Sequence, residues 1–162
     1  MTLTPTSRQK YLCKMQKLNL PDYDFKFKKQ QGKTYIFDDF RKKYVVITPE
    51  EWVRQNLINF LVEKKNYPKS LIVVEKGLKI NDLVKRADVL VYKNSQPILL
   101  VECKSPSVKI SQETFDQISR YNLAFKVPYL LVSNGLNHYC CKIDFTNQSF
   151  RFLSDIPAFT EL

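Results

Sequence analysis

Three charged residues, Asp88, Glu102 and Lys104, are spaced so that they can share one face of a β-hairpin. The segments RADVLVY and PILLVECK that contain them are predicted strands, and they flank the short turn KNSQ. In a hairpin centred on Ser95, Asp88 lies directly opposite Glu102, and Arg86 lies opposite Lys104. All four charged side chains then point to the same face, because side chains alternate along a strand with a period of two.

This arrangement predicts a site for a divalent metal ion. Two opposed carboxylates, with Cβ atoms about 5 Å apart, repel each other unless one is protonated or a cation lies between them. Carboxylate oxygens, completed by water and substrate phosphate, are the ligands that Mg²⁺ prefers. An ion held by Asp88 and Glu102 can polarise a phosphodiester and lower the pKa of bound water. Lys104 is placed to orient that water or to stabilise developing charge.

The same four residues also allow a purely structural interpretation. Arg86, Asp88, Glu102 and Lys104 can satisfy one another as a quartet of salt bridges without a metal. The placement of the charges favours the catalytic interpretation, because the apolar run PILLV ends abruptly in Glu-Cys-Lys, where a central strand leaves its cover. Cys103, between the two charged residues, is expected to point into the apolar layer on the opposite face.

The elements around this hairpin predict an α/β (α+β) fold with a mixed sheet flanked by helices. Thr48 and Pro49 mark a helix start, with Glu51 completing a capping box, and the helix is expected to reach about Lys65. Its predicted core-facing stripe consists of Val53, Leu57, Phe60 and Leu61. Ser111 is expected to cap a second helix, whose buried stripe is Phe115, Ile118, Asn122 and Phe125. Further strands are predicted at TYIFDDF, KYVVI, LIVVEKGL, VPYLLVSNG, HYCCKID and SFRFL.

The predicted organisation is a basic N-terminal arm over residues 1–31, including a solvated loop KFKKQQGK, followed by one domain over residues 32–162. The formal net charge is +10, which favours binding to polyanions such as nucleic acid. No run of about 18 apolar residues and no apolar signal segment is present, so we expect a cytoplasmic protein with no membrane span. The four cysteines show no metal-binding spacing, and adjacent Cys140 and Cys141 are expected to face opposite sides of a strand.

The pattern D-x₁₃-E-x-K after a Thr-Pro-Glu-Glu helix start resembles the PD-(D/E)XK nuclease superfamily. More narrowly, TPEEWVRQ, YPKSLIVVEK, RADVLVY, LLVECKSP, QISRYN and LLVSNG resemble the N-terminal nuclease domain of type I restriction enzyme R subunits, in its small stand-alone bacterial form. The resemblance covers roughly residues 44–155 and implies a restriction-endonuclease-like fold.

The resemblance also implies roles for individual residues. Asp88 and Glu102 match the metal-binding carboxylates, and Lys104 matches the catalytic lysine. The family places a further acidic residue on the first helix, and here Glu50 is expected in that role, with Glu51 as the alternative. Mg²⁺ or Mn²⁺ is the expected cofactor.

The helix after the lysine strand carries a Q-x-x-x-Y element, formed here by Gln117 and Tyr121. The resemblance implies that these two residues contact DNA or the catalytic lysine, although both also fit ordinary helix positions. Arg86 and Arg54 are further candidates for contacts with nucleic acid. Glu75 is a secondary candidate that is expected to pair with Arg86.

The function implied is a metal-dependent nuclease that hydrolyses DNA phosphodiesters in restriction or repair. The sequence contains no GxxxxGK[ST] phosphate loop, so no ATP-driven motor is carried over from the R subunit. The expected partners are DNA and either a second copy of the chain or a separate specificity or motor protein. Two alternatives remain: a catalytically weak nucleic-acid-binding module of the same fold, and a protein-interaction domain that docks through its basic residues Lys26, Lys28, Lys29, Lys33, Arg41, Lys42 and Lys43.

Overall fold

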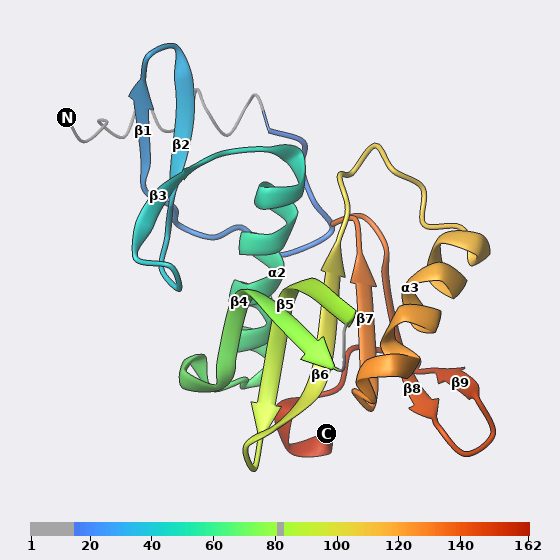
Figure 1. Cartoon of the computed structure of the whole chain (residues 1–162). Coiled ribbons are helices and arrows are strands. Elements are labelled where there is room, and N and C mark those ends of the chain that lie inside the picture. Colours follow the sequence, from blue (N-terminus) through green and yellow to red (C-terminus); the bar gives the residue numbers. More distant parts are fainter. Residues whose placement is uncertain (1–14, 81–82) are drawn as a thin grey trace.

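The computed structural model describes residues 15–80 and 83–162 of the chain, which form two sheets and two α-helices (Figure 1). In chain order the elements are β1 (Phe27–Gln30), β2 (Lys33–Asp38), β3 (Lys43–Val46), α2 (Pro49–Lys65), η1 (Lys69–Leu71), β4 (Ile72–Ile80), β5 (Leu83–Lys93), β6 (Gln96–Cys103), α3 (Gln112–Phe125), β7 (Tyr129–Ser133), β8 (His138–Asp144), β9 (Ser149–Phe152) and η2 (Phe159–Glu161). None of the helices in the described residues has the length and apolar character needed to cross a membrane.

The larger sheet has the order β4-β5-β6-β7-β8-β9 and is mixed, because β6 and β7 run parallel while the other neighbours run antiparallel. Its two faces pack against different helices. Val89, Val101 and Leu131 pack in one core with α2, and Leu90, Leu100 and Leu130 pack in a second core with α3. A central strand covered on both faces is therefore confirmed, as is the predicted α+β class.

The cysteines follow the same division between the two cores. Cys103 and Cys140 lie in the core on the α2 side, and Cys141 lies in the core on the α3 side. All three are buried free thiols. The opposite orientations predicted for Cys140 and Cys141 are confirmed, while Cys13 lies outside the described residues.

Helix α2 begins and ends as the sequence predicts. The Thr48 hydroxyl accepts a hydrogen bond from the Glu51 N–H at 3.0 Å, and Pro49 occupies the first turn. After Lys65, Asn66 ends the helix in the left-handed conformation with φ 59°. Of the predicted stripe, Val53, Leu57 and Leu61 are fully buried and Phe60 is partly buried.

Helix α3 is capped by Ser111, whose hydroxyl accepts from the Thr114 N–H at 3.2 Å. Phe115 and Ile118 are buried against the sheet, and the Asn122 side chain donates to the Val127 carbonyl at 2.8 Å. This bond ties the end of the helix to the strand that follows. The side chain of Phe125, also predicted for this stripe, lies outside the described part of the chain.

The predicted loop KFKKQQGK is wrong, because Phe27–Gln30 form β1, which pairs antiparallel with β2. Phe27 lies opposite Ile36, and both are buried against α2. The signal missed was the alternation of Phe25 and Phe27 with lysines, which is a strand period of two.

The segment before β1 also packs against the core. Leu18 is buried, and the Asn19 N–H donates to the Gly135 carbonyl at 2.7 Å. A Cβ atom on Gly135 would lie 2.6 Å from a Leu18 methyl carbon, so this contact depends on glycine. Of the arm predicted over residues 1–31, residues 1–14 lie outside the described residues, and the segment from residue 15 onward contributes to the core.

Candidate active site

The hairpin register that brings the candidate carboxylates together is the predicted one. Val89 pairs with Val101 and Leu90 with Leu100. The same register, carried one residue further, places Asp88 beside Glu102. Nearer the turn the pairing shifts by one residue at an irregularity between Val91 and Tyr92. The turn is therefore formed by Asn94 and Ser95, both with positive φ, and is not centred on Ser95 alone.

Asp88 is held at the end of this ladder by its side chain. Its Oδ2 accepts a hydrogen bond from the Cys103 N–H at 2.7 Å. The carboxylate thus binds the backbone directly between Glu102 and Lys104. Lys104 follows immediately, and its own N–H donates to the Ser133 carbonyl of β7 at 2.8 Å. Neighbouring strands on both sides therefore fix the backbone that carries Glu102 and Lys104.

The electrostatics of Asp88 show that the candidate residues act on one another. The pKa of Asp88 is raised to about 6, mainly by burial and also by the nearby Glu102 and Glu50 carboxylates, while the hydrogen bond from the Cys103 N–H acts to lower it. Lys104 is the cation that acts in the opposite direction. Among these charges, two carboxylates raise the pKa of Asp88 and one ammonium group lowers it.

The two glutamates at the start of α2 occupy different environments. The Glu51 carboxylate accepts hydrogen bonds from Arg41 at 2.9 Å, from Gln55 at 2.7 Å and from Arg54. These bonds take the place of the reciprocal capping-box bond predicted for it. Glu50 is exposed and makes no ion pair or hydrogen bond with the rest of the described chain, while its charge reaches Asp88. The geometry therefore favours Glu50 over Glu51 as the helix carboxylate of the site.

A buried ion-pair network lies beside the site and was not found from the sequence. Arg54 Nη2 contacts Asp38 Oδ2 at 2.7 Å and also contacts Glu51. Arg41 bridges the same two acids, with its Nε 2.5 Å from Asp38 and its Nη2 2.9 Å from Glu51. Arg54 is only 3% exposed, so its predicted contact with nucleic acid is corrected to a structural role inside the protein.

This network extends to Glu75, which sits beside Asp88 in the sheet. The β4–β5 ladder is interrupted there, and Glu75 adopts a left-handed conformation with φ 51°. Its Oε2 lies 2.6 Å from Arg41 and 2.6 Å from Arg86. Burial acts to raise the pKa of Glu75, but the bonds from Arg86 and Arg41 bring it below its ordinary value.

The pair between Glu75 and Arg86 is therefore confirmed. Because Arg86 bonds to Glu75, the alternative quartet of salt bridges with Asp88, Glu102 and Lys104 loses one of its two cations. Arg86 remains exposed, and its contact with nucleic acid stays a prediction.

The remaining candidates lie on α3. Gln117 is exposed, and within the described residues no hydrogen bond joins it to Asp88 or Lys104. The side chain of Tyr121 lies outside the described part of the chain. The roles of both residues stay predictions.

The donor set at Asp88 and Glu102 fits a hard divalent ion. Among the described residues, no three acidic, histidine or cysteine side chains already converge as a complete metal-binding group. Mg²⁺ needs only one or two carboxylates, with water and phosphate oxygens as its other ligands. Burial and the neighbouring carboxylates raise the pKa of Asp88, and a bound cation would act in the opposite direction, favouring the charged form.

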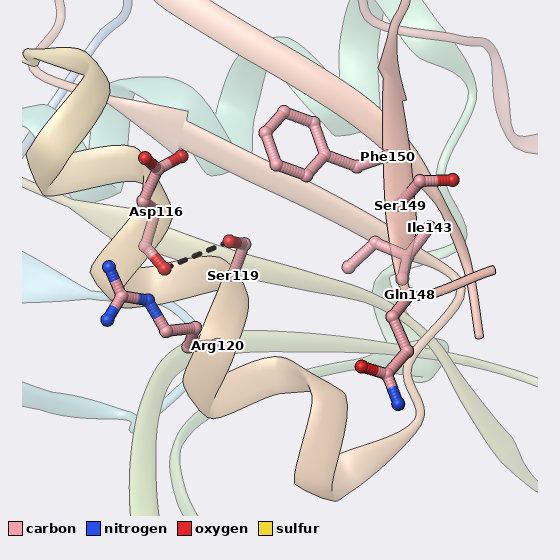
Figure 2. A pocket seen from close by; sticks show the side chains of 7 residues that line it. All are labelled: Asp116, Ser119, Arg120, Ile143, Gln148, Ser149 and Phe150. Carbon is pink, nitrogen blue, oxygen red and sulfur yellow. Dashed lines mark hydrogen bonds between the residues drawn. The ribbon is translucent and has the colours of Figure 1, made fainter.

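A separate pocket of about 200 Å³ lies between α3 and the β8–β9 hairpin (Figure 2). Figure 2 shows the lining residues Asp116, Ser119 and Arg120 on the helix and Ile143 and Phe150 on the strands. None of the candidate catalytic residues lines this pocket, so the candidate chemistry is not located there.

Comparison with known proteins identifies relatives of the chain. The structure of a putative HsdR subunit fragment of a type I restriction enzyme from Vibrio vulnificus is similar, with 21% sequence identity and a TM-score of 0.44. The alignment covers 62% of this chain, and it spans 22% of the length of that relative. A search of curated proteins found no match.

The family model described as type I restriction enzyme R protein N terminus matches residues 49–157. This range begins at the first residue of α2 and includes Asp88, Glu102, Lys104 and α3. It covers about two thirds of the chain. The chain therefore belongs to the family of type I restriction enzyme R protein N-terminal domains.

Proposed function

We propose that this chain is a metal-dependent nuclease that hydrolyses DNA phosphodiester bonds. The observation that carries the proposal is the position of Asp88, which is held by the Cys103 N–H beside Glu102 and whose pKa is raised to about 6. Membership of the R protein N-terminal family supports a role in restriction. A buried acidic pair of this kind is costly in a protein that has no ligand for it.

The residues have distinct proposed roles. Asp88, Glu102 and Glu50 would hold Mg²⁺ or Mn²⁺, and such an ion supplies electrostatic stabilisation of charge on the phosphate. Lys104, fixed by its backbone bond to Ser133, orients the nucleophilic water and stabilises negative charge that develops on the phosphate. Gln117 and Tyr121 would contact the DNA strand from α3.

The proposed partners are DNA and either a second copy of the chain or a separate specificity or motor protein. We place this activity in the cytoplasm. The chain aligns with 22% of its structural relative, so the activities of a whole R subunit are not assigned to it.

Cleavage of supercoiled plasmid with Mg²⁺ or Mn²⁺ tests the proposal. We expect wild-type protein to nick the plasmid only with metal, and we expect Asp88→Ala and Lys104→Ala each to abolish nicking. Glu113→Ala is a matched control, because Glu113 is an exposed acid on α3. Equal activity in wild type and both site variants would contradict the proposal. DNA binding without any cleavage would favour the nucleic-acid-binding module instead.

A further inference from the structure

The three-stranded sheet presents an outer face that carries lysines along β1 and aromatic side chains on β2 and β3. Its inner face is apolar, since Phe27 pairs with Ile36 and Ile36 with Val45, and all three pack against the core. Side chains at the positions between them must point away from α2. Six residues therefore form the outer face: Lys26, Lys28, Tyr35, Phe37, Tyr44 and Val46.

These six residues form two rows across the strands. In the first row Lys28 pairs with Tyr35, and Tyr35 pairs with Val46, which is 42% exposed. In the second row the Phe37 N–H donates to the Lys26 carbonyl at 2.9 Å, and Phe37 pairs with Tyr44.

The rings and ammonium groups of this face contact one another. The Lys28 ammonium lies 4.6 Å from the centre of the Tyr44 ring and 5.3 Å from that of Tyr35. Lys26 lies 5.8 Å from the Phe37 ring centre, and Phe37 and Tyr44 make an edge contact at 5.2 Å.

The charge of this sheet is strongly unbalanced at its surface. Five lysines lie on or between the three strands, Lys28, Lys29, Lys33, Lys42 and Lys43, and Lys26 lies immediately before β1. The two acids in the same stretch are Asp38, which is buried in the ion-pair network, and Asp39, which is 3.9 Å from Lys42. The surface therefore complements a polyanion.

We propose that the outer face of the β1–β2–β3 sheet binds single-stranded nucleic acid. Lysines beside aromatic rings can bind phosphates while the rings stack on bases. A flat sheet face can stack only on bases that are already unstacked from their neighbours, which a duplex does not present. This surface thus selects single strands over duplex.

The sheet is held in a fixed relation to the candidate active site. Arg41, between β2 and β3, is ion-paired with Glu51 on α2 and with Glu75 on β4, which lies beside Asp88. The sheet that carries this face is therefore anchored to α2 and β4, which lie around the candidate site. Presentation of a bound strand to the candidate carboxylates rests on the proposed nuclease function, whereas binding itself does not.

Fluorescence anisotropy with a labelled oligothymidylate of about 16 nucleotides, and with a duplex of the same length, tests the proposal in EDTA. We expect wild type to bind the single strand more tightly. Tyr35→Ala and Tyr44→Ala should each weaken that binding about tenfold or more, while Tyr35→Phe and Tyr44→Phe retain it, because stacking needs the ring and not the hydroxyl. Lys28→Ala should make binding less dependent on salt. The slope of the logarithm of the binding constant against the logarithm of the salt concentration should fall in magnitude by about 0.7.

Lys142→Ala is the matched control, since Lys142 lies 5.6 Å from the Tyr129 ring centre on the larger sheet. If the alanine variants do not fold, Lys28→Glu reverses a charge on the same face and should weaken single-strand binding. The proposal is overturned if duplex binds as tightly as single strand, or if the Tyr35, Tyr44 and Lys28 variants bind like wild type. It is also overturned if neither nucleic acid binds.

The two proposals fail separately. Loss of the single-strand preference would refute this surface and leave metal-dependent plasmid cleavage standing. Absence of cleavage by wild type would refute the nuclease and leave the binding result standing.

Discussion

Two acidic clusters lie next to each other around the start of α2, and their charges are balanced differently. In the first, Asp38, Glu51 and Glu75 each bind at least one guanidinium group, from Arg41, Arg54 or Arg86. In the second, Glu102 and Glu50 both act to raise the pKa of Asp88, and Lys104 is a cation that acts to lower it.

The balance of charge is reflected in the pKa values. Burial acts to raise the pKa of Asp38, but hydrogen bonds and charge from Arg41 and Arg54 hold it below its ordinary value. Burial is also the largest cause at Asp88, and there burial together with Glu102 and Glu50 outweighs the Cys103 N–H and Lys104, so that the pKa is raised to about 6. Burial alone therefore does not distinguish the clusters. The first cluster is therefore balanced by arginines of the protein, and we propose that a bound cation would stabilise the charged form of Asp88 in the second.

The largest expected effect is on activity. Asp88→Asn should reduce metal-dependent plasmid cleavage on the order of 10³-fold, because it removes a proposed metal ligand while its amide oxygen can still accept the Cys103 N–H. Cleavage rates at equal protein concentration measure the effect. Retention of more than about a tenth of wild-type activity would show that Asp88 is not a ligand.

Asp38→Ala should lower the free energy of unfolding by about 3–5 kcal/mol, because the buried Arg54 guanidinium loses one of its carboxylate partners. Urea denaturation measures this change. Asp39→Ala is the matched control, since Asp39 is exposed and its contact with Lys42 is long, so its effect should stay below about 0.5 kcal/mol. Equal effects from the two variants would contradict the structural role of the network.

Asp88→Asn should stabilise the metal-free protein at pH 8 by up to about 3 kcal/mol. The folded-state pKa of Asp88 is raised from 3.8 to about 6, so the folded state holds the proton more tightly than the unfolded state. Stability from this group is therefore present below about pH 4 and is lost as the pH rises through 6. Urea denaturation of both proteins at pH 4 and pH 8 checks the sign, and a gain at pH 4 alone would contradict it.

Substitutions of the two helix glutamates should have different effects, one on metal binding and the other on the free energy of unfolding. Glu50→Gln should weaken Mn²⁺ affinity about tenfold and change the free energy of unfolding by less than about 0.5 kcal/mol, because Glu50 is exposed. Glu51→Gln should cost about 1–3 kcal/mol of stability, because Arg41 and Arg54 lose a charged partner. Calorimetric Mn²⁺ titration and urea denaturation measure the two effects. The opposite assignment would make Glu51 the ligand.

Local patterns were sufficient to predict most of the candidate site. The strand period of two and the short KNSQ turn place Asp88 beside Glu102, and the Thr48 cap fixes where α2 begins. The hydrogen bond from Cys103 to Asp88 was not predicted, because it depends on where the β5–β6 ladder stops.

Long-range packing explains what the sequence did not reveal. The predicted stripe of α2 describes one buried face, but the small sheet covers a second face and buries Arg54 there. Glu75 adopts a positive φ and pairs with Arg41, which is far from it in sequence. Neither feature leaves a periodic signal in the sequence.

The pKa of the Asp88 carboxyl, measured by NMR with and without saturating Mg²⁺, tests the central claim most directly. We expect a value near 6 without metal and a value below the ordinary 3.8 with metal, because bound cation favours the carboxylate. The pKa of Asp38 should not change with Mg²⁺, since its partners are Arg41 and Arg54. An Asp88 pKa that is ordinary without metal, or one that Mg²⁺ does not alter, would contradict a metal site at Asp88 and Glu102.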